Sequence, residues 1–144
     1  MKVEFKILEI THDDLVNLFS TATYDSSYLS MGLPKGSYKG TELENVNDCV
    51  EDKWAKVLLN GGSVYVYDYY AEDEDEFYGN LPHEWNGNRM RYTITLEDIK
   101  RGLESCNKDE YLRKNLEELI TEDIDLIGAE NIMQQIVFGE VIYG

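Results

Sequence analysis

The chain has 144 residues, of which 42% are hydrophobic and 29% are charged, and these are ordinary values for a folded domain. A chain of this length can bury one core, so we expect a single domain that spans residues 1–144. No apolar run approaches the roughly 18 residues that span a bilayer, and the N-terminus lacks the apolar core of a signal peptide. We therefore expect a cytoplasmic protein.

Charge is the property that departs most from the norm. The chain carries 13 Lys and Arg residues against 29 Asp and Glu residues, a formal net charge of -16. Binding to nucleic acid or to an anionic membrane depends on Lys and Arg, so both are disfavoured as partners. The excess acid either serves solubility or complements the basic surface of a partner protein.

The N-terminal third of the chain predicts a strand, a helix and a long loop. Residues 3–7 alternate between apolar and charged side chains, as a strand with one buried face does. Thr11 and Asp14 match a helix-start signal, and apolar residues then recur at helical spacing to about Thr23. Residues 24–45 mix turn formers with tyrosines and show no period, which predicts a long irregular loop.

The middle third predicts a helix followed by an antiparallel hairpin. A helical stripe of apolar residues begins near Asn47 and ends at a pair of glycines. Residues 63–71 alternate, with three tyrosines on one face and two valines and Asp68 on the other. Residues 72–88 are predicted to form a loop, and residues 89–96 alternate again. Because sequential strands usually pair, these two strands should form the hairpin.

The C-terminal third predicts three helices. Thr95 caps a short helix that ends near Gly102, and Asn107 starts a second one. Residues 129–138 form the last helix, and residues 141–143 are a candidate closing strand. The order of elements fits an α+β fold, with a small antiparallel sheet and helices packed on one side of it.

No local motif for catalysis or metal binding is present. The only histidines are His12 and His83, so the usual general base and the usual zinc ligand are both scarce. The chain lacks HExxH, GxSxG, P-loop and GxGxxG patterns. Cys49 and Cys106 lie far apart in the sequence, and we expect both to be reduced, buried thiols. We expect no cofactor and no metal site.

The best catalytic constellation that the sequence offers is Asp68 with His83 and Glu84. A half-buried carboxylate has a raised pKa and can act as a base. The simpler interpretation is that Asp68 marks the exposed end of its strand or accepts a hydrogen bond from a backbone amide, and that His83 is a turn residue. We favour the simpler interpretation.

Two charged groups in the hairpin region have competing interpretations. Residues 72–76 are all acidic and offer ligands to calcium, but the run continues into Phe77 and lacks the spacing of an EF-hand loop. A solvated loop is the favoured interpretation. Arg89 and Arg91 share the wetter face of the hairpin, where they can pair with a phosphate or carboxylate of a ligand, or with acidic neighbours across the strands.

Two groups of residues are candidate contacts for a partner protein. The acidic run offers charge to a basic surface, and tyrosines of the predicted 24–45 loop offer contact area at small entropic cost. The candidates are Glu72, Asp73, Glu74, Asp75, Glu76, Tyr24, Tyr28 and Tyr38. If many carboxylates line one face at the spacing of DNA phosphates, the protein would mimic nucleic acid toward an enzyme that handles DNA or RNA.

The central third of the chain carries a resemblance that points in the same direction. The stretches GGSVYVYD at residues 61–68 and YTITLEDI at residues 92–99 resemble small proteins carried by phages and mobile elements of bacteria. Such elements encode anti-restriction and anti-CRISPR proteins, many of them small, acidic and stoichiometric. The resemblance therefore implies an inhibitor, and it assigns no role to any residue.

Three functions of different class follow from these observations. The first is a protein-binding inhibitor of a bacterial defence enzyme that processes nucleic acid, and it predicts clustered carboxylates and exposed tyrosines. The second is a structural or regulatory module of a phage or mobile element that forms oligomers, and it predicts an exposed apolar patch. The third is a small enzyme, and it predicts a pocket that holds Asp68 or His83. We favour the first.

Overall fold

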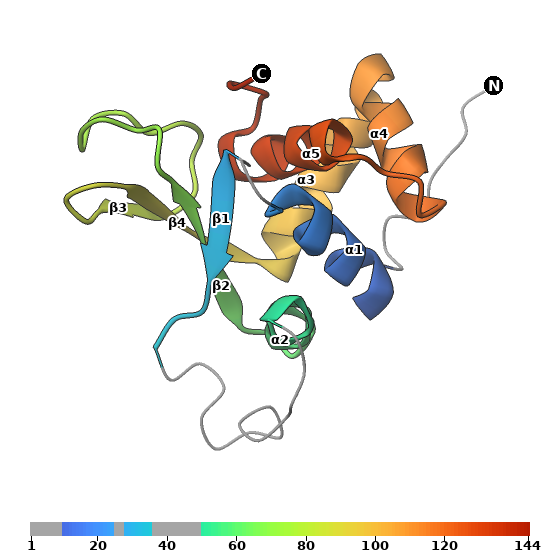
Figure 1. Ribbon diagram of the computed structural model, residues 1–144, viewed down its shortest axis with the longest axis horizontal. Coiled ribbons are helices and arrows are strands. Elements are labelled where there is room, and N and C mark those ends of the chain that lie inside the picture. The colour runs from blue at the N-terminus through green and yellow to red at the C-terminus, as the bar shows by residue number, and fades with distance from the viewer. Residues whose placement is uncertain (1–9, 25–27, 36–49) are drawn as a thin grey trace.

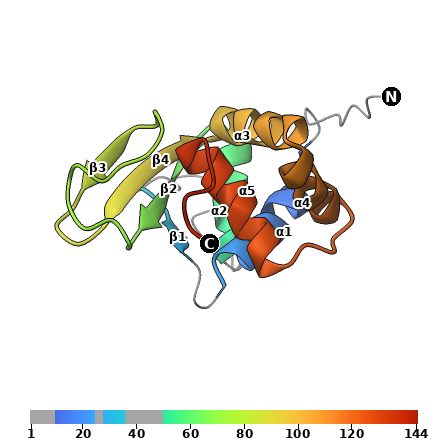
Figure 2. The same ribbon diagram turned by 90° about the horizontal axis from the view of Figure 1, so that it is seen from above.

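The protein has an α+β fold, as the order of predicted elements indicated. The computed structural model describes residues 10–24, 28–35 and 50–144. Within these ranges the chain forms five helices and one four-stranded antiparallel sheet (Figure 1). Both views place these helices on one side of the sheet (Figures 1 and 2). The strand predicted at residues 3–7 lies outside the described residues, as do Tyr38 and Cys49.

The elements follow one another with short connections after residue 90. The helices are α1 (His12–Ala22), α2 (Val50–Leu59), α3 (Leu96–Lys108), α4 (Glu110–Ile120) and α5 (Leu126–Phe138). The strands are β1 (Leu29–Gly32), β2 (Ser63–Asp68), β3 (His83–Trp85) and β4 (Met90–Thr95). The strand order across the sheet is β1-β2-β4-β3, so β2 and β4 are the central pair.

The predicted hairpin is confirmed as the centre of the sheet. Strand β2 pairs antiparallel with β4, with Ser63 opposite Thr95 and Asp68 opposite Met90. Alternate residues of both strands are buried, which the period of two in the sequence had indicated. These buried side chains face the helices and form the sheet's share of the core.

Both predicted loops of this region contain a strand, so the two loop predictions are wrong in part. Leu29–Gly32 pairs with β2 and buries Leu29 and Met31, although it lies inside residues 24–45. His83–Trp85 pairs with β4 inside residues 72–88. Each strand has four residues or fewer, and such a short segment shows no period that would separate it from a loop. The neighbouring strand, rather than the local sequence, decides that these segments are extended.

Helix α5 is the central element of the helical layer. It packs against α1, α3 and α4, and nearly all of its residues are buried. Asp125 caps its first turn, so the helix begins at Leu126, three residues before the predicted start at Ala129, and Gly139 ends it in the left-handed conformation. The predicted start was late because Gly128, a poor helix former, lies in the first turn.

Helix α3 is longer than the sequence indicated, because Gly102 does not end it. The predicted capping box of Thr95 and Asp98 is confirmed. A Cβ added at Gly102 would lie only 2.6 Å from the Cα of Ile136, so this glycine lets α3 and α5 approach closely. The prediction that Asn107 starts the next helix is also wrong. Asp109 is its N-cap and accepts hydrogen bonds from the amides of the first turn.

The C-terminal segment is held by a side chain instead of by strand pairing. Residues 141–143 form no strand, contrary to the prediction. The buried Gln134 accepts hydrogen bonds through Oε1 from the amides of Ile142 (2.8 Å) and Tyr143 (2.7 Å) and donates through Nε2 to the carbonyl of Tyr143 (3.0 Å). The side-chain amide of Gln134 thus makes the hydrogen bonds that the backbone of a neighbouring strand would otherwise make.

Candidate protein-binding surface

The side of the sheet that faces away from the helices carries a row of tyrosines. Tyr65 and Tyr67 project from β2 on this side, and Tyr69 continues the row just beyond the strand. Neighbouring ring centroids are 6.1 Å and 6.4 Å apart. Tyr67 packs over Gly32 of β1, where an added Cβ would lie 3.0 Å from the Tyr67 ring. The row is therefore set by the alternation of β2 and by a glycine on the adjacent strand.

Arg89, just before β4, and Arg91 of β4 stack on these tyrosines. The guanidinium carbon of Arg89 lies 3.8 Å from the centroid of Tyr67 and 5.4 Å from that of Tyr69, and Arg89 also donates a hydrogen bond to the Tyr69 hydroxyl. Arg91 lies 4.2 Å from the centroid of Tyr65. Such cation–π contacts hold the flat guanidinium groups parallel to the surface. The five residues are called the Tyr-Arg face below: Tyr65, Tyr67, Tyr69, Arg89 and Arg91.

The two arginines differ in their acidic partners. Arg91 forms an ion pair of 2.6 Å with Glu84, which lies directly opposite on β3. This is the cross-strand pairing with acid that the sequence favoured, and it is confirmed for Arg91. For Arg89, the partners recorded in the described part of the chain are tyrosines. Among the described residues, no carboxylate forms an ion pair with Arg89.

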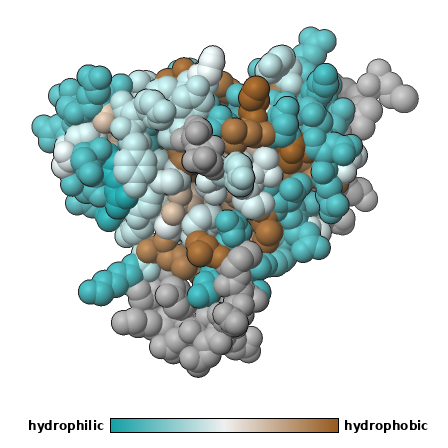
Figure 3. Space-filling view, viewed as in Figure 1, coloured by the Kyte–Doolittle hydropathy of each residue, from teal (hydrophilic) through white to brown (hydrophobic). Residues whose placement is uncertain are grey.

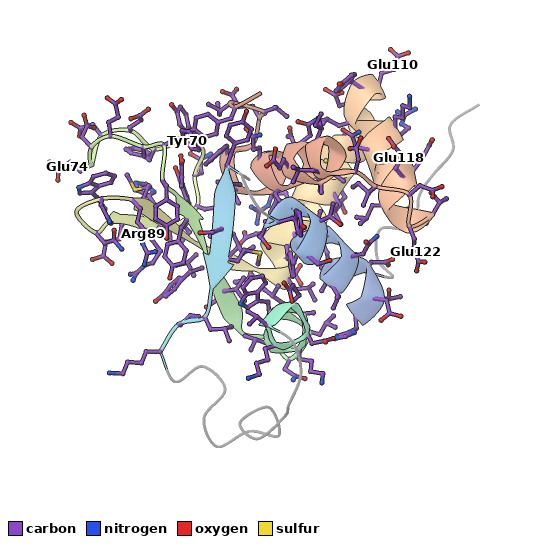
Figure 4. All side chains as sticks on the ribbon, in the orientation of Figure 1. Tyr70, Glu74, Arg89, Glu110, Glu118 and Glu122 are labelled. Atoms are coloured by element: carbon purple, nitrogen blue, oxygen red, sulfur yellow. The ribbon has the colours of Figure 1, made fainter. Side chains whose placement is uncertain are left out.

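The acidic run forms an ordered loop next to this face. Figure 4 shows Glu74 and Arg89 at the same end of the molecule. Within the loop the amide of Glu72 donates to Oε2 of Glu76 (2.7 Å) and the amide of Asp75 donates to Oδ1 of Asp73 (2.9 Å). These bonds fold the run back on itself and leave four of its five side chains exposed. Among the described residues none of the five carboxylates forms an ion pair.

A second group of carboxylates lies at the opposite end of the molecule. Figure 4 shows Glu110 and Glu118 on α4 and Glu122 just after it, far from Glu74. The acidic loop and the carboxylates of α4 are therefore separate groups at opposite ends of the molecule. A charge that is divided in this way acts locally at each end, because exposed charges are screened beyond about 10 Å.

Two of the three predicted contact tyrosines, Tyr24 and Tyr28, lie within the described residues. Tyr24 follows α1 and is 71% exposed. Tyr28 is half-buried, and its ring stacks on Tyr143 at 5.3 Å and lies 5.4 Å from Tyr70. Tyr28 is therefore occupied by internal contacts. The tyrosine with a recorded contact to the acidic run is Tyr78, whose hydroxyl donates to Oε1 of Glu76 (3.4 Å). The tyrosines of β2, which the sequence had indicated as a packed sheet face, lie on the open side of the sheet.

Asp68 is fully buried and has a structural role. Its carboxylate accepts hydrogen bonds from the Tyr143 hydroxyl (2.8 Å) and from the amide of Tyr70 (2.9 Å). Burial raises the pKa of Asp68, and these hydrogen bonds oppose the shift. The interpretation that Asp68 bonds a backbone amide is confirmed, whereas the idea of an exposed strand end is wrong.

His83 does not join Asp68 in a catalytic pair. Its ring stacks on Phe77 at 4.1 Å, and its Nδ1 lies 2.9 Å from the carbonyl oxygen of Leu81. None of the hydrogen bonds or ring contacts recorded for the described residues connects it to Asp68. The two residues sit on different strands with β4 between them. The geometry favours a structural role for both, but the prediction that His83 is a turn residue is wrong, because His83 begins β3 and lies opposite Tyr92 of β4.

Sequence reasoning missed two buried polar residues of α5 that hold other segments of the chain. Gln134 and Glu130 lie on α5, where Glu130 accepts a hydrogen bond from the amide of Tyr28 (3.2 Å) and burial raises its pKa. The available signal was the presence of polar residues within the apolar stretch 129–138. Buried polar side chains of this kind need partners, so they mark places where another segment of the chain is held.

Thiol chemistry and metal binding are disfavoured in the described part of the chain. Cys106 is buried with a free thiol, and burial raises its pKa to about 12, which makes it unreactive. No group of three or more His, Cys, Asp or Glu side chains is arranged there to hold a metal ion. None of its helices has both the length and the apolar character needed to cross a bilayer.

Comparisons with protein-family models, with curated proteins and with solved structures find no match to this chain. The function proposed below therefore rests on the chain's own residues.

Proposed function

We propose that this protein is a protein-binding module that docks its Tyr-Arg face and its acidic loop, residues 72–76, onto a basic surface of a partner. The observation that carries the proposal is the Tyr-Arg face itself, an open sheet face of stacked tyrosines and arginines beside an ordered acidic loop. Tyrosine and arginine are the residue types most enriched at the energetic centres of protein interfaces. Rigid side chains also lose little entropy on binding.

A protein is a better partner for this surface than a nucleic acid. Aromatic and arginine side chains on a sheet also occur where proteins stack nucleobases. Here, however, Arg91 is already paired with Glu84, and the adjacent loop presents five carboxylates that repel phosphates. The same acidic loop attracts a basic protein surface, and this electrostatic attraction favours fast association.

The partner class that we propose is a bacterial defence enzyme that processes nucleic acid, with this chain as its inhibitor. Such enzymes present basic surfaces to nucleic acid, and a chain with a net charge of -16 complements them. Because the acidic loop and the carboxylates of α4 lie at opposite ends, the proposal uses local docking of the loop and needs no continuous imitation of a duplex.

The experiment that tests this proposal captures partners and then measures affinities. The tagged full chain is incubated with bacterial lysate at about 0.05 M and 0.5 M salt, and bound proteins are identified by mass spectrometry. The affinity of the purified partner is then measured for the wild type, Tyr67→Ser and Glu74→Lys. The matched control is Glu117→Lys, which makes the same charge change at an exposed position of α4.

The expected result is a partner that dissociates at high salt and binds Tyr67→Ser and Glu74→Lys at least about tenfold more weakly, with little effect of Glu117→Lys. Thermal unfolding of each variant checks that the fold is kept. Equal affinities for all four proteins, or no partner that depends on these residues, would contradict the proposal. Tyr24→Ser shows in the same assay whether the predicted contact residue beyond α1 contributes.

A further inference from the structure

A groove lies on the helical side of the molecule, away from the Tyr-Arg face. It runs between the first turn of α4, helix α5 and the C-terminal segment 139–144, and it encloses about 590 Å³. That volume is in the range of sites that hold a ligand or a few side chains of a partner. Its walls come from three parts of the chain that tertiary packing brings together.

The rim of the groove exposes large apolar side chains. Tyr111 is 71% exposed, Ile127 is 67% exposed and Val141 is 41% exposed, and all three line the groove. Figure 3 shows hydrophobic residues gathered beside the C-terminal segment and over α5. Single exposed apolar residues are ordinary, but three from separate segments around one groove form a surface that a partner can cover.

The charge of the groove is of one sign. Among the described residues, the charged side chains that line it are Asp109 and Glu140, and no lysine or arginine of these ranges lines it. Asp109 uses Oδ1 to cap α4, with bonds of 2.9 Å and 3.0 Å to the first-turn amides, so its position is fixed. A groove with apolar walls and two carboxylates fits a cation that is carried on an apolar body, such as a lysine or arginine side chain.

The walls of the groove are held in place without a ligand. Gln134 anchors the C-terminal segment through three hydrogen bonds to its backbone. Gln135 donates to the carbonyl of Gly139 at 3.0 Å, and Asn131 donates to Oδ1 of Asn115 on α4 at 3.3 Å. The groove is thus preformed, and binding needs little reorganisation of the backbone.

We infer that this groove binds a basic amphipathic segment of a partner protein. Apolar side chains of the segment cover Tyr111, Ile127 and Val141, and its lysine or arginine side chains lie against Asp109 and Glu140. This surface is separate from the Tyr-Arg face, so the inference does not rest on the function proposed above. A second copy of this chain fits poorly, because a symmetric contact would bring the same carboxylates of two strongly acidic chains together.

The test uses the full chain and synthetic peptides of known chemistry. A fluorescent amphipathic peptide of about 18 residues, made of leucine and lysine, is titrated with the protein, and anisotropy reports binding. Two further peptides separate the contributions: one has glutamate in place of lysine, and the other has serine in place of leucine. The protein variants are Ile127→Asp and Glu140→Lys in the groove, with Ile120→Asp and Glu117→Lys as exposed controls on α4 outside it.

The leucine–lysine peptide is expected to bind, and both altered peptides are expected to bind at least about tenfold more weakly. Ile127→Asp and Glu140→Lys should weaken binding by about tenfold relative to their own controls, which carry the same charge change. Tyr67→Ser should leave the peptide affinity unchanged, so that failure here and failure of the proposed function are distinguishable. Thermal unfolding confirms that each variant is folded.

Three results would overturn the inference. One is equal weakening by Ile120→Asp and Ile127→Asp, which would mean that charge alone drives binding. Another is equal binding of the leucine–lysine and serine–lysine peptides, which would show that the apolar rim is unused. The third is a dimer in analytical ultracentrifugation that Ile127→Asp abolishes, which would assign the groove to a second copy of the chain.

Discussion

The two sides of strand β2 differ in burial: one side contributes to the core and the other is open. On the side of the helices Val64, Val66 and Asp68 are buried, and the one polar member has its hydrogen bonds supplied by the surrounding chain. On the other side Tyr65 and Tyr67 are only half-covered, and arginines stack on them. Changes on the helix side should therefore alter stability, and changes on the open side should alter binding.

The largest expected difference is between two adjacent residues of β4. Tyr92 points toward the helices and is fully buried, with its ring edge-on to Phe138 at 5.4 Å, whereas Arg91 points to the open side. Tyr92→Ala should lower the free energy of unfolding by about 3–5 kcal/mol because it leaves a large cavity. Arg91→Ala should cost less than about 1 kcal/mol. Urea unfolding of both variants measures the two values, and similar values would remove the contrast between the sides.

The next largest effect concerns the buried carboxylate of Asp68. Asp68→Ala removes the acceptor of the Tyr143 hydroxyl and of the Tyr70 amide, and each donor left unpaired in the interior costs about 1–3 kcal/mol. Tyr143→Phe removes one donor and should cost less than Asp68→Ala. Thermal unfolding gives the order of the two variants. If Asp68→Ala were as stable as the wild type, Asp68 would not be a structural residue.

The same carboxylate should give the protein a specific dependence on pH. Burial raises the pKa of Asp68 above its usual value of 3.8, so the folded protein keeps this proton to a higher pH than the unfolded chain does. The stabilisation from the bound proton is complete below the unfolded pKa and is lost as the pH rises through the folded pKa. As the pH rises above the usual pKa of 3.8, the wild type should lose stability relative to Asp68→Asn, which does not titrate.

Urea unfolding of both proteins at several pH values measures this difference. Glu130 is also buried with a raised pKa, and it titrates in both proteins, so the comparison isolates Asp68. Parallel curves for the two proteins would contradict the assignment of a raised pKa to Asp68.

The smallest expected effect is at the acidic loop. Glu74 is exposed and forms no ion pair within the described residues, so Glu74→Gln should change the free energy of unfolding by less than about 0.5 kcal/mol. A slight gain is expected, because the substitution relieves repulsion among neighbouring carboxylates. Urea unfolding at low salt measures it. A loss of more than about 1 kcal/mol would show that the loop supports the fold and is not simply presented to a partner.

The sequence predicted those parts of the fold that have a strong period or a local start signal. The alternation of residues 63–68 and 90–95 gave the central hairpin, and the capping boxes at Thr11 and Thr95 gave the starts of α1 and α3. These signals are local, because a strand with one buried face and a helix N-terminus each need specific residues at fixed spacing. It also indicated that Arg91 pairs with acid across the strands.

The candidate surfaces were less accessible to sequence reasoning. The acidic run was visible at once, but its neighbour on the folded protein, the Tyr-Arg face, requires the pairing of β2 with β4. The groove at α4 and α5 joins residues that are up to about 30 positions apart, and no pattern in the sequence connects Tyr111 with Val141. A contact between distant residues depends on the packing of whole elements, which a local pattern does not encode.

By itself, the sequence determined that this chain is strongly acidic, that it forms an α+β fold, and that β2 has an apolar side with one polar residue. Only the tertiary structure decided that Asp68 is satisfied by Tyr143, that Gly102 belongs to the interior of a helix and that Gln134 holds the C-terminal segment. The physical reason is the same in each case. The structural role of a buried polar group, or of a glycine, depends on the segment that packs against it.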